Sequence, residues 1–100
     1  MNIAVEGPVI GVLTVQWLLP GCRSLKEKRG RMHGVRDRFG RETGVAVCES
    51  AFADAHQRAQ WSFVVAASDR QVVVSTLDRI EREVSVSVDG LISHRFRDVG

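Results

Sequence analysis

Two segments of this chain show the same succession of a strand pattern and a helix-capping motif. Residues 9–19 are almost all apolar, with several β-branched side chains, and a Pro-Gly pair ends them. The next motif is Ser24-Leu25-Lys26-Glu27, a capping box in which the serine and glutamate side chains can satisfy each other's backbone N–H groups. Residues 61–67 and then Ser68-Asp69-Arg70-Gln71 repeat this order. We therefore expect two central strands, each leading directly into a helix.

Apolar residues recur at helical spacing after each capping motif. They are Leu25, Met32, Val35 and Phe39 in the first helix, and Val73, Leu77, Ile80 and Val84 in the second. The β-branched run at residues 72–74 disfavours a helix locally, but the periodicity and the cap favour one more strongly. Gly30 and Gly34 weaken the first helix, and we expect them to let it approach a sheet closely.

Two further strands complete the predicted order. Residues 44–52 form a more polar strand that suits a sheet edge, and residues 53–60 form either a polar connection or an irregular hairpin arm. A last strand lies within residues 86–96. The order strand, helix, strand, strand, helix, strand predicts a ferredoxin-like βαββαβ α+β fold in a single domain, residues 1–100. We expect a four-stranded antiparallel sheet with the first and third strands in the middle and both helices on one face. Residues 1–8 are expected to be loosely ordered.

The residues at these junctions also resemble a known family. The resemblance rests on Leu19-Pro20, Ser24-Leu25-Lys26-Glu27-Lys28-Arg29, Phe39, Val45, Val47, Glu49, Gln57-Arg58-Ala59 and Ala67-Ser68-Asp69. In these the chain resembles the YlxP-like family of small bacterial proteins. The resemblance implies a ferredoxin-like fold and a cytoplasmic protein. Genes of that family often lie beside genes for translation initiation and ribosome maturation factors, which implies a connection with RNA or the ribosome. It supplies no catalytic residue.

Positive charge is concentrated in one segment. Residues 23–41 hold eight of the fourteen Lys and Arg residues against two acidic ones, about +6, so the rest of the chain carries about −4. Such a field favours an anionic partner, and we predict RNA or a ribosomal subunit. The residues expected to contact phosphates are Arg23, Lys26, Lys28, Arg29, Arg36 and Arg38. An ordinary solvated helix is the plainer interpretation. Two further alternatives are a homodimeric module that binds an acidic protein and a small-molecule-sensing domain.

Aromatic residues lie on the two predicted central strands. Trp17, Trp61 and Phe63 would be neighbours there, as in modules that stack RNA bases. The glycine- and aromatic-rich strand motif of those modules is absent, however, and no basic residue lies among the aromatics of residues 61–65. We expect these side chains to pack in a core or a dimer interface. A homodimer is predicted through the sheet face opposite the helices, with Leu13, Val15, Trp17, Phe63 and Val65 at the interface.

The sequence carries no pattern that favours an enzyme, a metal site or a cofactor. His33, His56 and His94 lack ligand spacing with one another or with the cysteines. Cys22 and Cys48 are too few for a disulfide framework and are expected to be reduced, in keeping with a cytoplasmic protein. No apolar run approaches the ~18 residues of a membrane span. Glu49 interrupts a strand pattern and could pair with a basic side chain across the sheet, contact a ligand or discourage edge pairing.

Overall fold

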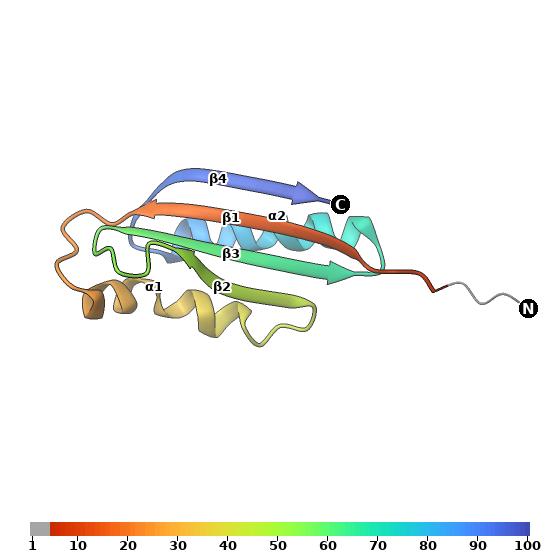
Figure 1. The fold of residues 1–100 in the computed structure, drawn as a ribbon, viewed down its shortest axis with the longest axis horizontal. Helices are drawn as coiled ribbons and strands as arrows, with labels where there is room; N and C mark the ends of the chain where they lie inside the picture. Colours follow the sequence, from red (N-terminus) through yellow and green to blue (C-terminus); the bar gives the residue numbers. More distant parts are fainter. Residues whose placement is uncertain (1–4) are drawn as a thin grey trace, which may run out of the picture.

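The computed structural model describes residues 5–100, and their elements follow the predicted order (Figure 1). The elements are β1 (Val9–Leu18), α1 (Leu25–Phe39), β2 (Val45–Ala51), β3 (Arg58–Ala67), α2 (Arg70–Ser87) and β4 (Leu91–Val99). The predicted ferredoxin-like fold is confirmed. Of the residues expected to be loosely ordered, 1–4 lie outside the described residues, and 5–8 precede β1 without belonging to an element.

The four strands form one antiparallel sheet in the order β2-β3-β1-β4, with β1 and β3 in the middle as predicted. β1 pairs along its whole length with β3, so that Leu13 lies opposite Phe63. Both helices cover the same face: α2 packs against β1 and β3, and α1 packs against β2. Figure 1 shows α2 passing behind the sheet. β3 begins at Arg58, three residues before the predicted start.

The residues predicted to form a dimer interface lie in the core instead. Leu13, Val15, Trp17, Phe63 and Val65 are each 3% exposed or less, on the face that the helices cover. The ring of Phe63, for example, meets the ring of Phe39 edge-on at 5.6 Å between centroids. That prediction is wrong because both alternating sets of residues in β1 are largely apolar, so the pattern does not say which set the helices cover.

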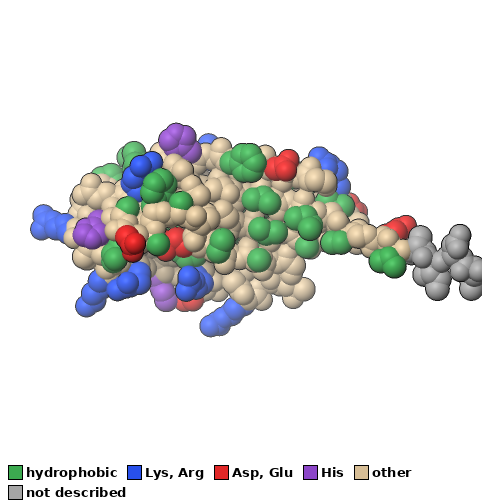
Figure 2. Space-filling model, in the orientation of Figure 1, with side chains coloured by type: hydrophobic (Ala, Val, Ile, Leu, Met, Phe, Trp, Pro, Cys, Tyr) green, Lys and Arg blue, Asp and Glu red, His purple; other side chains and the backbone are tan. Residues whose placement is uncertain are grey.

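The open face of the sheet, opposite the helices, is a mixture of polar and apolar side chains. Hydroxyl groups form a ladder across three strands, with Thr14 Oγ1 and Ser50 Oγ each 2.8 Å from Ser62 Oγ. Large apolar side chains surround the ladder, and the most exposed ones on this face are Ile10, Leu18, Leu91 and Phe96. Figure 2 shows hydrophobic side chains spread over this side of the molecule. The open face of the sheet is therefore only partly apolar, whereas the dimer prediction assumes a largely apolar face.

Both helices begin at capped positions. Ser24 caps α1 by accepting a hydrogen bond from the Glu27 backbone N–H at 3.0 Å, which is one half of the predicted capping box. The other half differs, because the Glu27 carboxylate accepts from the Arg23 backbone N–H at 2.9 Å in place of that of Ser24. In α2 the cap lies one residue later than predicted: Asp69, not Ser68, accepts from the Gln71 backbone N–H at 2.7 Å. An aspartate at the N-cap serves the same function, because its carboxylate also accepts from the first free N–H groups.

Gly30 and Gly34 are exposed and do not mediate close packing of α1. A Cβ atom at either position would meet nothing within 4 Å, so the expected close approach to the sheet is wrong. We predict that Gly30→Ala and Gly34→Ala each raise the free energy of unfolding by up to about 1 kcal/mol, because alanine is the better helix former. Urea unfolding measures this difference. Gly11→Ala is the matched control and should destabilise, because its Cβ would lie 2.5 Å from Val73 Cγ1. If Gly30→Ala and Gly34→Ala both lower the free energy of unfolding, the two glycines do not face solvent as described.

Candidate nucleic-acid interface on the first helix

Three cations share one solvent-facing stripe of α1. Lys26, Arg29 and Arg36 are all exposed, and their spacings of three and seven residues place them on one side of a helix with 3.6 residues per turn. We call these three residues the cationic stripe. It runs about 15 Å along the helix, at a rise of 1.5 Å per residue. His33 lies on the same side, with its Nε2 3.1 Å from Asp37 Oδ2.

Within the described part of the chain, the stripe differs from Lys28, Arg31 and Arg38 of the same helix in having no acidic partner. Among residues 5–100, no carboxylate lies within 4.0 Å of the charged nitrogens of Lys26, Arg29 or Arg36. Arg31, in contrast, pairs with Glu27 at 3.2 Å. Arg23 precedes the helix and is exposed, and its backbone N–H donates to Glu27, which holds the pKa of that carboxyl below its usual value. The charge on the outer side of α1 is therefore not neutralised within the described protein.

Lys28 does not belong to the exposed charge, and its prediction as a phosphate ligand is wrong. The residue is 3% exposed, and its Nζ donates to the carbonyl oxygens of Phe52 at 2.6 Å and Ala55 at 2.9 Å. The same nitrogen lies 3.3 Å from Glu49 Oε2. Glu49 thus pairs with a basic side chain from α1 and not with one across the sheet. Phe52 has φ 61°, a backbone region that non-glycine residues rarely adopt, so Lys28 holds a strained turn in place.

The burial of Lys28 has a signal in the sequence. Lys28, Met32, Val35 and Phe39 are the buried residues of α1, and their spacings of four, three and four follow the helical period more closely than a series beginning at Leu25. A series of apolar residues passes over this position, and a lysine is seldom buried unless it is paired. The pairing partner, Glu49, comes from a different element, and helical periodicity carries no information about it.

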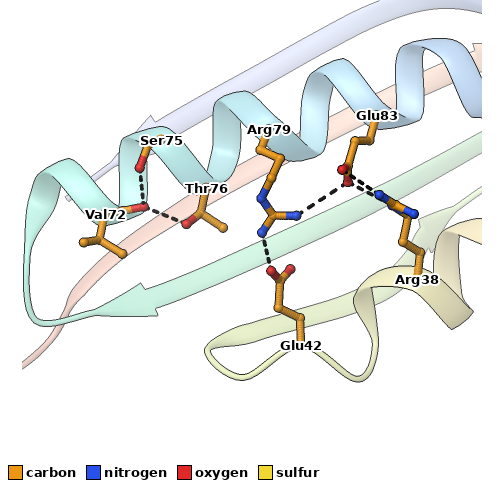
Figure 3. A network of polar contacts seen from close by, with 7 residues as sticks. All are labelled: Arg38, Glu42, Val72, Ser75, Thr76, Arg79 and Glu83. Atoms are coloured by element: carbon orange, nitrogen blue, oxygen red, sulfur yellow. Dashed lines mark hydrogen bonds and ion pairs between the residues drawn. The ribbon is translucent and has the colours of Figure 1, made fainter.

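Arg38 is held by a network that joins the two helices. Its guanidinium donates to both carboxylate oxygens of Glu83, at 2.9 Å through Nε and 2.7 Å through Nη2 (Figure 3). These bonds raise the pKa of Arg38 and lower the pKa of Glu83. Arg79 extends the network to Glu83 and Glu42. Arg38 therefore contributes to packing between α1 and α2, and we remove it from the set expected to contact phosphates.

A cleft of about 230 Å³ lies beside the stripe, where α1 meets β2 and β3. Arg29 and Arg36 line it together with Met32, Glu49 and Trp61. The Arg36 guanidinium lies 5.5 Å from the centre of the Trp61 ring, within range of a cation–π contact. The indole nitrogen of Trp61 is buried and has no hydrogen-bond partner among residues 5–100. Periodicity within single elements could not predict this cleft, because it is assembled from residues on three of them.

Comparison with known proteins identifies the family. Residues 10–94 match the model of a family described as "Protein of unknown function (DUF503)". The chain belongs to the DUF503 family. No curated protein matches it. Among solved structures, this DUF503 protein is similar to the de novo designed protein Ferredog-Diesel, with 13% identity and a TM-score of 0.50 over 98% of this chain and 91% of the design. A likeness at that identity shows the fold alone, so the function must be argued from the side chains.

The remaining candidate chemistry of this DUF503 protein is sparse in the part that the structure describes. No three His, Cys, Asp or Glu side chains of residues 5–100 gather into a group that could hold a metal ion. Cys22 is buried and Cys48 is exposed, and both are free thiols. Neither of the helices described is long and apolar enough to cross a membrane. The cationic stripe and the adjoining cleft are therefore the surface features on which we base a function.

Proposed function

We propose that this DUF503 protein is a non-enzymatic, cytoplasmic protein that binds RNA through the cationic stripe of α1. The observation that carries the proposal is the division of charge around the helix. Lys28, Arg31 and Arg38 are paired with carboxylates, whereas the three exposed cations of the stripe have none within 4.0 Å among residues 5–100. The cations of the stripe can therefore bind phosphates without breaking an ion pair that is present in the described protein.

RNA fits the stripe better than an acidic protein surface does. Phosphates recur at a regular spacing along a strand, and a line of exposed Lys and Arg side chains can follow them. Two of the three cations are arginines, whose planar guanidinium donates two parallel hydrogen bonds to one phosphate. Arg23 lies before the positive end of the helix dipole and adds a fourth cation. The resemblance to the YlxP-like family also supports RNA or the ribosome as the partner.

The proposal predicts a measurable dependence on salt. Three to four neutralised phosphates give a slope of about −2 to −3 in a plot of log affinity against log salt concentration for a single strand. Fluorescence anisotropy with a labelled single-stranded RNA, repeated over a range of salt concentrations, measures that slope. An absence of binding at low salt contradicts the proposal and favours the acidic protein partner. A slope near zero contradicts it as well, because phosphate contacts must release counterions.

Self-association is a second proposal, based on the open face of the sheet. Phe96 is 59% exposed, Leu91 is 61% exposed and Ile10 is 47% exposed, and all three lie on that face. Exposed apolar side chains that gather on one sheet face favour contact with another protein surface, here a second copy of the chain. Sedimentation at tens of micromolar tests this expectation. A dimer in the wild type that becomes a monomer in Phe96→Ser supports it, and a monomeric wild type contradicts it.

A further inference from the structure

The cleft beside the cationic stripe combines three kinds of chemistry in a small space. Met32 and Trp61 are almost completely buried, so they form an apolar floor, while Arg29 and Arg36 are exposed and form the rim. Glu49 adds a carboxylate whose side chain is 25% exposed. At about 230 Å³ the cleft is smaller than the ~300–1,000 Å³ of most small-molecule sites. It therefore suits a single ring system and not a large cofactor.

This combination disfavours simple ligands. A bare phosphate would contact the arginines but would also meet the like charge of Glu49. The cleft's own ammonium group, on Lys28, is already occupied by Glu49 and two backbone carbonyls. A purely apolar ligand would shield the Glu49 carboxylate from water without offering it a hydrogen-bond donor beyond its ion pair with Lys28, and removing a charged group from water in this way is costly. A ligand that fits must be flat, must carry N–H donors and must be attached to an anion.

An unpaired nucleotide has these three properties. Unstacked RNA bases pack on aromatic rings or arginine guanidinium planes and form hydrogen bonds through their edges. The guanidinium plane of Arg36, which lies over the nearly buried Trp61 ring, offers such a surface, and Arg29 lies at the rim, where the attached phosphate would be.

We infer that the cleft holds one unpaired RNA base with an exocyclic amine, which donates to the Glu49 carboxylate while the cationic stripe holds the neighbouring phosphates. An ionised carboxylate only accepts hydrogen bonds, so it matches the exocyclic amine of cytosine, adenine or guanine. Uracil has a carbonyl oxygen where cytosine has the amine, and two acceptors would then face each other. This inference rests on the proposed RNA binding and adds a base preference to it.

Matched single-stranded oligonucleotides test the preference with the wild-type protein. Ten-residue oligocytidine and oligouridine carry the same phosphates, so the stripe contributes equally to both. We expect oligocytidine to bind about tenfold more tightly, the size expected for one good hydrogen-bonded base contact. Equal affinities overturn the inference and leave the proposed RNA binding intact. If neither oligonucleotide binds at low salt, both proposals fail.

A variant pair then locates the preference. In Glu49→Gln the carboxamide has both a donor and an acceptor, so the cytidine-to-uridine ratio should fall to about one. Glu81→Gln removes a carboxylate from α2 that pairs with Arg95 and Arg97, and it should keep the wild-type ratio. A folded Glu49→Gln protein that keeps the full preference contradicts the role of Glu49. Circular dichroism and urea unfolding of each variant show that the comparison is between folded proteins.

Discussion

The double variant Arg29→Glu/Arg36→Glu is expected to bind single-stranded RNA about a hundredfold more weakly than the wild type at low salt. Both residues lie on the exposed side of α1, and neither has a carboxylate within 4.0 Å among residues 5–100. Reversing them replaces two phosphate contacts by two repulsions. The slope of log affinity against log salt should also become shallower by about 1.4, or about 0.7 for each lost contact. Fluorescence anisotropy over several salt concentrations measures both effects.

The control for this variant must change net charge by the same amount at another place. Arg70→Glu/Arg82→Glu does so on α2, where both residues are exposed and neither pairs with a carboxylate within 4.0 Å among residues 5–100. This control should keep most of the RNA affinity and nearly the wild-type salt slope. Equal losses in the two double variants would show that RNA responds only to net charge, and they would contradict a specific interface on α1.

Lys28→Ala is expected to lower the free energy of unfolding by about 3 kcal/mol. The substitution leaves the Glu49 carboxylate without its cation and removes the donor shared by the Phe52 and Ala55 carbonyls. Loss of that donor also frees the strained turn at Phe52 between β2 and β3. Since urea lowers the stability of small proteins by about 1–3 kcal/mol per molar, the unfolding midpoint should fall by about 1–3 M.

Lys26→Ala is the matched control for Lys28→Ala, two residues earlier in the same helix. Lys26 is exposed and has no carboxylate within 4.0 Å in the described chain, so its removal should change stability by about 0.5 kcal/mol or less. The order should be reversed for RNA affinity. A folded Lys26→Ala protein should bind RNA more weakly than a folded Lys28→Ala protein, because Lys26 belongs to the cationic stripe and Lys28 does not. If Lys28→Ala costs no more stability than Lys26→Ala, the buried position of Lys28 has no structural importance.

Most of the fold could be predicted because several local signals agree at the boundary between β1 and α1 and along α2. Pro20 follows closely after β1, and Ser24 caps α1 through the Glu27 backbone N–H. In α2 the β-branched residues 72–74 oppose a helix, yet burial of Val73 on the core side outweighs their local preference. The start of β3 was missed because Arg58 and Gln60 look like loop residues. They are in fact the open-face positions of a strand in which Ala59 is buried.

The candidate site could be predicted only in part, because it depends on contacts between elements. The exposed positions of Lys26, Arg29 and Arg36 follow from helical spacing alone. The ion pairs of Lys28 and Arg38 cannot be predicted from helical spacing, because their partners Glu49 and Glu83 lie on β2 and α2. The prediction of the dimer-interface residues failed for a related reason: alternation divides the residues of a strand into two faces but does not say which face the helices cover.

Mapping the RNA contact by NMR tests the central claim most directly. The protein has 100 residues, which suits assignment of its backbone amides, and a labelled sample can be titrated with a single-stranded RNA at low salt. We expect the largest chemical-shift changes at residues 23–36, on the outer side of α1, with little change on the open face of the sheet. The account is contradicted if the largest changes fall on the open face, around Thr14 and Phe96, while α1 is unaffected.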